Sequence, residues 1–106
     1  MNQNSNLKLI QGDSFQVNVT LDNVDNLIID SIIFSCSALG LCKKLEHDLN
    51  KWVFKLTSSE TKNFPKFIGD YDLTVKFIDG NTTTIIYRNS IEVLPKTNDI
   101  TLCNKI

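Results

Sequence analysis

Few residues in this chain are of the types that perform catalysis. Asp70 and Asp72 flank Tyr71, and in an extended strand their two carboxylates point to the same side. Paired carboxylates can act as general acid and base, but on a polar strand face their commoner role is solvation. The single histidine, His47, has no serine and aspartate partners close in sequence, so a catalytic triad is not indicated. We therefore expect a protein that is not an enzyme.

The cysteines form no recognisable metal or redox motif. They stand at positions 36, 42 and 103, without a Cys-x-x-Cys pair. A zinc site needs four ligands and would use every cysteine together with His47. Cys36 lies in an apolar alternation and is expected in the core, whereas Cys103 is expected in an exposed tail. Asp79-Gly80-Asn81 lacks the spaced aspartates of a calcium loop. We expect free thiols, no disulfide, no metal and no cofactor.

The composition is that of an ordinary globular domain. The chain has 106 residues, with 11 basic and 12 acidic side chains and a net charge of −1. This balance leaves no electrostatic footprint for nucleic acid. Lys43-Lys44 is the densest basic spot and is expected on a solvated strand or turn. No stretch approaches the roughly 20 apolar residues that span a bilayer. The first residues lack a signal-peptide pattern, so we expect synthesis and folding in a cytoplasm.

Alternation of apolar and polar residues predicts strands with one buried face through most of the chain. About seven strands at 8–12-residue spacing favour an all-β, immunoglobulin-like sandwich of two sheets. We expect one domain over residues 1–106, with an ordered core at 7–95 and a frayed tail at 96–106. The predicted core residues are Phe15, Val17, Val19, Phe34, Cys36, Trp52, Phe54, Tyr71, Leu73, Val75 and Phe77.

A single helical turn is predicted between two of these strands, from Thr57 to Phe64. Thr57 and Glu60 have the spacing of a capping box, in which each side chain bonds the other residue's backbone N–H. Pro65 should end the turn, because residues before proline avoid helical angles. We expect this turn to carry the chain from one sheet to the other. Tyr71 should then open the next strand, in the position of a tyrosine corner.

The order of these features resembles the immunoglobulin-like domain at the N-terminus of phage baseplate upper proteins, which also occurs as a stand-alone phage structural protein. The family pattern is a "G-D" turn with an alternating strand, an "L-x-S-x-x-T" helical turn, "G-x-Y-x-x-x-V", an aspartate-glycine hairpin and a closing strand. In residues 9–95 of this chain the matching segments are Gly12-Asp13 with QVNVTL, Leu56 to Thr61, Gly69 to Val75, Asp79-Gly80, and IEVLP at 91–95.

This resemblance implies a virion structural or assembly protein of the tail or baseplate. It would act through contacts with other virion proteins or with itself, as an oligomer in the particle. It would be assembled in the cytoplasm of a bacterial host, with no nucleic-acid or membrane partner.

The closing hairpin suggests where such contacts are made. Ile85 and Tyr87 take one face of the strand and Ile86 the other, so both faces are apolar. We predict an interaction surface of Ile86, Tyr87 and Arg88 at a strand edge or exposed sheet face. The alternative is a carbohydrate-binding module, or another immunoglobulin-like binding domain, with Tyr87 as its exposed aromatic platform.

Overall fold

A computed structural model of the chain describes residues 6–21, 25, 28–49 and 51–96. Within these residues the chain forms eight strands, one short α-helix and a 3-10 turn. They follow one another as β1 (Leu7–Ile10), β2 (Phe15–Val19), β3 (Ile29–Cys36), η2 (Ser37–Leu39), β4 (Leu41–Lys44), β5 (Glu46–Asp48), β6 (Lys51–Leu56), α1 (Ser58–Lys62), β7 (Phe67–Phe77) and β8 (Thr82–Leu94).

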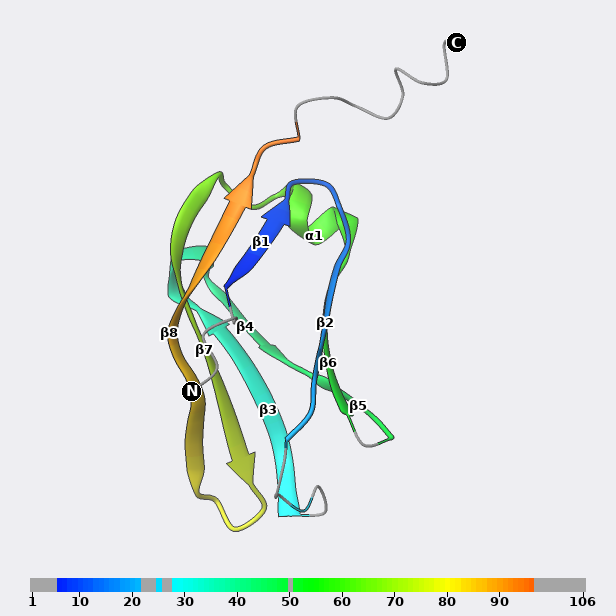
Figure 1. Cartoon of the computed structure of the whole chain (residues 1–106), viewed down its shortest axis with the longest axis vertical. Coiled ribbons are helices and arrows are strands. Elements are labelled where there is room, and N and C mark those ends of the chain that lie inside the picture. Colours follow the sequence, from blue (N-terminus) through cyan, green and yellow to red (C-terminus); the bar gives the residue numbers. More distant parts are fainter. Residues whose placement is uncertain (1–5, 22–24, 26–27, 50, 97–106) are drawn as a thin grey trace.

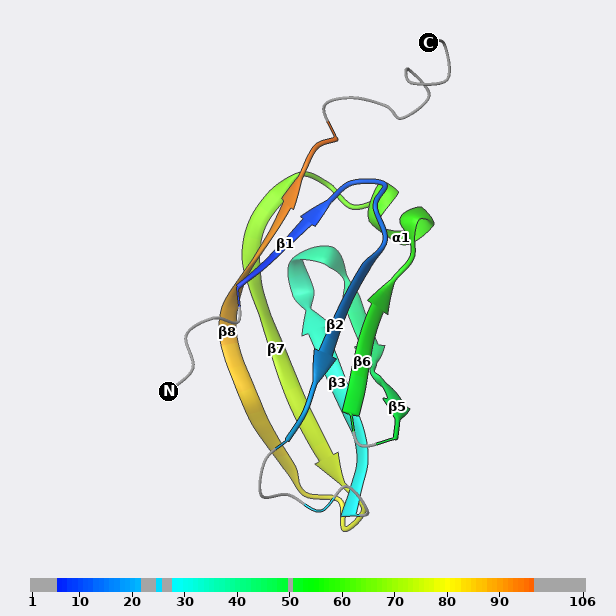
Figure 2. The same cartoon turned by 45° about the vertical axis from the view of Figure 1, so that its right-hand side comes forward.

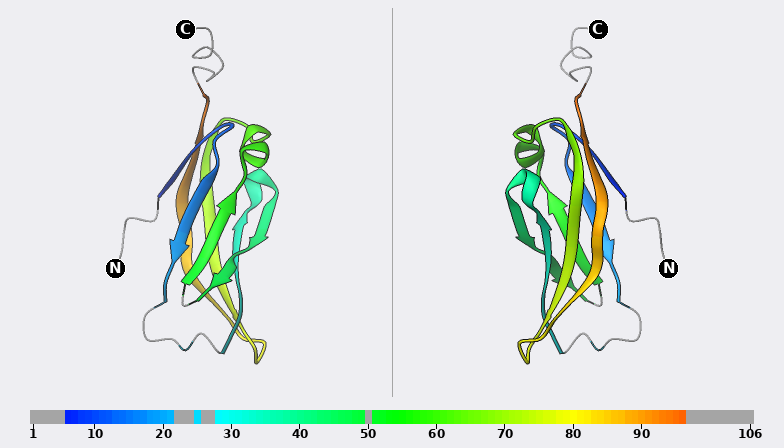
Figure 3. Two further views of the ribbon diagram at one scale, coloured as in Figure 1. Left: turned by 90° about the vertical axis from the view of Figure 1, so that its right-hand side faces the viewer. Right: turned by 90° about the vertical axis from the view of Figure 1, so that its left-hand side faces the viewer.

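The strands form two sheets that face each other, as Figures 1 and 3 show. The larger sheet has the order β1-β8-β7-β3-β4 and the smaller one the order β2-β6-β5. β1 pairs with β8 in parallel, and the other described pairs are antiparallel. The chain changes sheets after β1, β2, β4 and β6. The predicted all-β, sandwich-like fold is therefore confirmed.

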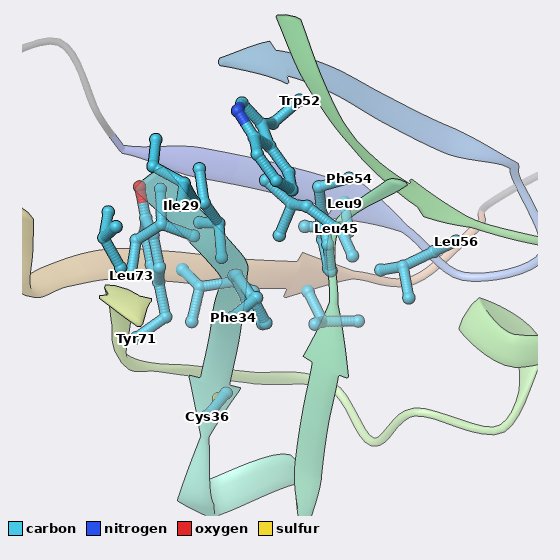
Figure 4. Packing of buried hydrophobic residues seen from close by; sticks show 14 residues of the cluster. Leu9, Ile29, Phe34, Cys36, Leu45, Trp52, Phe54, Leu56, Tyr71 and Leu73 are labelled. Atoms are coloured by element: carbon cyan, nitrogen blue, oxygen red, sulfur yellow. The ribbon is translucent and has the colours of Figure 1, made fainter. Parts of the chain in front are cut away.

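The core lies between the two sheets and is built around three stacked rings (Figure 4). The Phe34 ring on β3 stacks on Phe54 of β6 at a centroid distance of 4.2 Å and on Tyr71 of β7 at 5.1 Å. Because these rings come from both sheets, they join the two layers directly. Burial is confirmed for seven predicted core residues, namely Phe34, Cys36, Trp52, Phe54, Tyr71, Leu73 and Val75.

The other predicted core residues, Phe15, Val17, Val19 and Phe77, are only half-buried. The first three lie on β2, an edge strand of the smaller sheet, and Phe77 is the last residue of β7. Edge and terminal positions have neighbours on fewer sides, which leaves part of each side chain open to water. The prediction omitted buried residues from β1, from the second half of β8 and from other strand ends, among them Leu9, Ile29, Leu45, Leu56, Ile91 and Val93.

The predicted helical turn at the sheet crossover is confirmed. Thr57 is the N-cap of α1, and its hydroxyl accepts a hydrogen bond from the Glu60 N–H at 3.2 Å. The Glu60 carboxylate in turn accepts from the Thr57 N–H at 2.9 Å, which completes the capping box. α1 joins β6 of the smaller sheet to β7 of the larger one and ends before Pro65.

Thr61 attaches this helix to the turn between β1 and β2. Its side chain is fully buried, and its hydroxyl donates to the Asp13 carbonyl at 2.7 Å and accepts from the Gly12 N–H at 3.1 Å. Gly12 has a φ of 84°, in the left-handed region that favours glycine. The Gln11 side chain adds a hydrogen bond to the Phe64 carbonyl at 2.8 Å. Two segments that the sequence pattern singled out separately therefore meet at one end of the fold.

Three strand boundaries differ from the prediction. β7 begins at Phe67, so Tyr71 lies inside this strand and does not open it. β8 is one long strand that runs beside β7 (Figure 2), and the interruption that Asn89-Ser90 predicts is present as a bulge two residues earlier, at Tyr87 and Arg88. The polar run from His47 to Asn50 predicts a connection, but its first two residues belong to β5, which pairs with β6. At β5 and at the start of β7, pairing with a neighbouring strand overrides a weak local pattern. The tail from residue 97 onward, with Cys103, lies outside the described residues.

Candidate functional site

The outer face of the larger sheet carries the polar groups that the sequence singled out. Asp70 and Asp72 both point outward from β7, on the face opposite the buried Tyr71, as expected. A row of paired residues crosses this face, because Asp72 lies beside Ser35 on β3 and Ser35 lies beside Cys42 on β4. The row brings together side chains from three separate parts of the chain.

On the other side of Asp72, strand β8 contains a bulge. Its pairing with β7 shifts between Ile86 and Asn89, so that Tyr87 and Arg88 both lie opposite Asp72. Two residues opposite one is the defining feature of a β-bulge. Arg88 has a φ of 54°, a left-handed conformation that is uncommon for residues other than glycine. The bulge changes the direction in which the following side chains point.

Both aspartates interact with the bulged residue. The Arg88 backbone N–H donates to the Asp72 Oδ1 at 2.8 Å, which provides a partner for a backbone group that the irregular ladder does not use. The Arg88 Nε lies 3.6 Å from the Asp70 Oδ2. The Asp72 carboxylate is therefore fixed by a hydrogen bond, the Asp70 carboxylate forms an exposed ion pair with the same residue, and each keeps lone pairs for a further donor.

The bulge borders a shallow depression of about 580 Å³ on this outer face. We call it the outer-face depression. The residues that line it and matter below are Ser35, Cys42, Asp70, Asp72, Tyr87 and Arg88. Such a surface offers hydroxyl, carboxylate and guanidinium groups beside one aromatic ring, a set suited to binding polar molecules by hydrogen bonds and ring contacts.

The predicted interaction surface of Ile86, Tyr87 and Arg88 is divided by the bulge. Ile86 is half-buried, pairs with the buried Leu73 and packs against the core. Tyr87 and Arg88 lie on the outer face, and Tyr87 is 69% exposed. Ser35 and Cys42 were missed as site residues. Serines alternate with apolar residues around Ser35, which indicates that Ser35 lies on the polar face of its strand. This alternation does not indicate which strand lies beside it.

Tyr71 lies beneath this region with its ring in the core. Burial raises the pKa of its hydroxyl, and hydrogen bonding with the Asn89 side chain on β8 opposes that rise. The phenol is therefore held in its neutral form at physiological pH. Its role as a tyrosine corner stays a prediction.

The other residues considered for chemistry have structural surroundings. The His47 ring stacks on Trp52 at 4.2 Å with an interplanar angle of 4°. The Asp79 side chain accepts hydrogen bonds from the backbone and side chain of Asn81 in the hairpin turn. Cys36 is a buried free thiol, as predicted for a core cysteine, and Cys42 is an exposed one. In the part of the chain that the structure describes, no three His, Cys, Asp or Glu side chains come close enough to hold a metal ion.

The predicted basic spot also has a defined environment. Lys43 of β4 is half-buried, and its Nζ lies 3.1 Å from the Glu60 carboxylate, while Lys44 is exposed. The Thr57 N–H and then Lys43 lower the pKa of Glu60 below its ordinary value of 4.5. This pair joins β4 to α1 and stabilises the charged form of the capping residue.

A second exposed region lies at the end of the same outer face, where β1, β8 and β7 are adjacent. Ile10 of β1 is 41% exposed and Ile68 of β7 is 72% exposed. On β8, Leu94 pairs with Ile10 and is half-buried, and Glu92 pairs with Ile68. Ile68 and Leu94 also line a groove of about 440 Å³. We call Ile10, Ile68 and Leu94 the apolar end.

Comparison of the sequence with protein-family models finds no match, and comparison with curated proteins finds no similar protein. The resemblance to the phage domain therefore stays a prediction from the sequence pattern. In the ranges described, no helix is both long and apolar enough to cross a membrane.

Proposed function

We propose that this chain is an immunoglobulin-like domain that acts through protein–protein contacts, without catalysis, as a structural or assembly component of a phage tail or baseplate. Its partners are other virion proteins or further copies of itself, and it is assembled in the bacterial host cytoplasm. The phage context of this proposal comes from the sequence resemblance alone. The fold supports the other two parts of the proposal, which are the immunoglobulin-like class and action through surface contacts.

The strand order supports the immunoglobulin-like class. β8, β7, β3 and β4 are neighbours in the order of strands G, F, C and C′ of a variable-type domain, and β2, β6 and β5 follow the order B, E and D. The crossover helix α1 then falls between strands E and F. β2 and β7 contain no cysteine, so the inter-sheet disulfide of antibody domains has no counterpart. Domains with this strand order bind many unrelated partners.

The observation that carries the contact role is the apolar end. Apolar side chains from three adjacent strands meet there: Ile10 and Ile68 are exposed and Leu94 is half-buried. Isolated exposed residues are common, but a contiguous group of them marks an interaction site. Lys66 and Glu92 line the groove beside these side chains, and Glu92 pairs with Ile68 on one side and with Lys8 on the other, so charged groups adjoin the apolar ones.

The test is the association of the purified protein and its presence in particles. We expect sedimentation to detect self-association, or mass spectrometry to find the chain in purified virions of the phage that encodes it. Ile68→Lys should weaken self-association, or docking onto the neighbouring virion protein, about tenfold or more, with the fold intact because Ile68 is 72% exposed.

The matched control is Ile78→Lys. Ile78 is 67% exposed but lies in the β7–β8 turn, at the opposite end of these strands. We expect this variant to associate like the wild type. A protein that stays monomeric at high concentration and is absent from particles would rule the proposal out.

A further inference from the structure

The outer-face depression has a chemistry that a contact between apolar side chains does not need. It is lined by one exposed aromatic ring, one hydroxyl each from β3 and η2, two carboxylates from β7 and one guanidinium from β8. Its volume of about 580 Å³ lies within the roughly 300–1,000 Å³ that is usual for small-molecule sites. Its lining therefore has the size and the polar groups that suit a small polar ligand.

Tyr87 supplies a flat apolar surface beside these polar groups. The bulge places it on the outer face, where it is 69% exposed, next to the residues that hold the bulge. An aromatic ring can cover the C–H face of a pyranose, which is apolar although the rim of the sugar carries hydroxyls. An exposed tyrosine also loses little conformational freedom on binding, because it has only two side-chain torsions.

Of the polar groups around Tyr87, the Asp72 carboxylate is fixed by a hydrogen bond before any ligand arrives. Asp72 is held by the Arg88 N–H at 2.8 Å, and Asp70 lies 3.6 Å from the Arg88 Nε. A carboxylate has about four acceptor positions, so each aspartate can still accept from a hydroxyl. Ser35 can donate or accept, and Arg88 has further N–H donors. Groups already held in place lower the entropic cost of binding.

The charges select among polar ligands. Two carboxylates and one guanidinium line the depression, which leaves an excess of negative charge. Anionic sugars and phosphates would be repelled, whereas a ligand with many neutral hydroxyls meets both acceptors and donors. We propose that the outer-face depression binds a neutral saccharide, with Tyr87 stacked on a pyranose ring and Asp70 and Asp72 accepting hydrogen bonds from its hydroxyls. This inference goes beyond the proposed assembly role and uses different residues.

The experiment is a titration of the full chain followed by amide chemical shifts. The probes are neutral oligosaccharides of glucose, galactose, mannose and N-acetylglucosamine, with an oligogalacturonate as the anionic counterpart. We expect at least one neutral probe to shift amides around Ser35, Asp72 and Tyr87 at millimolar concentration, and the anionic probe to shift none of them.

Three variants identify the groups responsible. Tyr87→Ala should weaken binding about tenfold or more, whereas Tyr87→Phe should retain most of it because the ring remains. Asp70→Asn should weaken binding several-fold, since an amide oxygen is a poorer acceptor than a carboxylate. Ile78→Ala, at the far end of the hairpin, should leave binding unchanged.

The possible outcomes are decisive. A response that maps to the depression and is lost in Tyr87→Ala supports the proposal. No response to any neutral probe, a response elsewhere on the surface, or equal binding by Tyr87→Ala overturns it. A protein partner that occupies the depression while no sugar does so also overturns it. Failure here leaves the assembly role standing, because Ile68→Lys and particle composition test that role independently.

Discussion

Two segments depart from regular strand structure, namely the crossover helix α1 and the bulge of β8. Each is held by a hydrogen bond from or to a side-chain oxygen, which is buried in the first and exposed in the second. At the crossover helix α1, the fully buried Thr61 hydroxyl joins the helix to the backbone of Gly12 and Asp13. At the bulge of β8, the Asp72 carboxylate accepts the Arg88 N–H at the surface, and the adjacent Tyr87 is 69% exposed.

The same kind of hydrogen bond therefore stabilises the fold at the crossover, whereas at the bulge it fixes groups that a ligand can reach from solvent. A buried polar group that loses its partner costs about 1–3 kcal/mol, whereas water replaces a lost partner at the surface. Among the described residues, every buried side-chain nitrogen or oxygen has a hydrogen-bond partner. The crossover should therefore be sensitive to substitution in unfolding experiments, and the bulge should be sensitive in binding experiments.

The largest expected effect is at Phe34, whose ring lies between the two segments. It stacks on Phe54 of the strand that leads to α1 and on Tyr71 below the bulge. Phe34→Ala should lower the free energy of unfolding by about 3–5 kcal/mol, measured by urea denaturation. Phe77→Ala should cost less, because Phe77 is half-buried. Equal losses would mean that the stacked rings are not the centre of the core.

Thr61 tests the buried hydrogen bonds of the crossover directly. Thr61→Val keeps the side-chain volume and removes the hydroxyl that Gly12 and Asp13 use, so we expect a loss of about 1–3 kcal/mol. Thr61→Ser keeps the hydroxyl and removes one buried methyl, a loss of about 0.8 kcal/mol. If the serine variant is the less stable of the two, the hydroxyl does not join these segments as described.

The capping box should contribute a smaller and pH-dependent effect. Thr57→Ala should cost about 0.5–2 kcal/mol at neutral pH. The pKa of Glu60 is lower in the folded state than its ordinary value of 4.5. Its stabilising effect is therefore fully present above about pH 4.5 and is lost as the pH falls through the lowered folded-state pKa. Unfolding of wild type and Glu60→Gln should differ at pH 7 and converge in acid; a constant difference would contradict this.

The smallest effect on stability is expected at the bulge. Arg88 has a φ of 54°, which glycine adopts without steric cost. Arg88→Gly should leave the free energy of unfolding within about 0.5 kcal/mol of wild type. Glycine removes the steric strain of the left-handed conformation, and this gain offsets the larger conformational entropy that glycine gives the unfolded chain. Lys76→Gly, at a regular exposed position of β7, should cost about 0.5–1 kcal/mol. A large loss in Arg88→Gly would assign the bulge a stabilising role like that of the crossover.

Much of the fold could be predicted because its signals are local. The alternations around Phe34, Phe54 and Leu73 each assign one strand face without reference to any other strand. The capping box needs only Thr57 and Glu60, which are three residues apart and bond to each other's backbone. Burial of Leu9 was missed because β1 is short and acquires its neighbours by pairing with β8.

The candidate site was predictable only in part. The outward direction of Asp70 and Asp72 followed from alternation about the buried Tyr71. The inward direction of Ile86 did not, because Ile86 lies between two register shifts in the pairing of β8 with β7, and each shift reverses the alternation of β8. The partners of Asp72 at this site, Ser35 and Arg88, are far from it in sequence and meet it only through strand pairing.

The sequence by itself determined the strand faces, the cap of α1 and its end before Pro65, because the interactions responsible lie within a few residues of one another. The tertiary structure alone decided that Thr61 bonds to Gly12 and Asp13, that Ile86 packs inside, and that the outer-face depression exists. Each of these depends on which distant segments become neighbours when both sheets close over one core. Local propensity does not carry that information, since a threonine hydroxyl or a strand register has many possible partners until the core selects one.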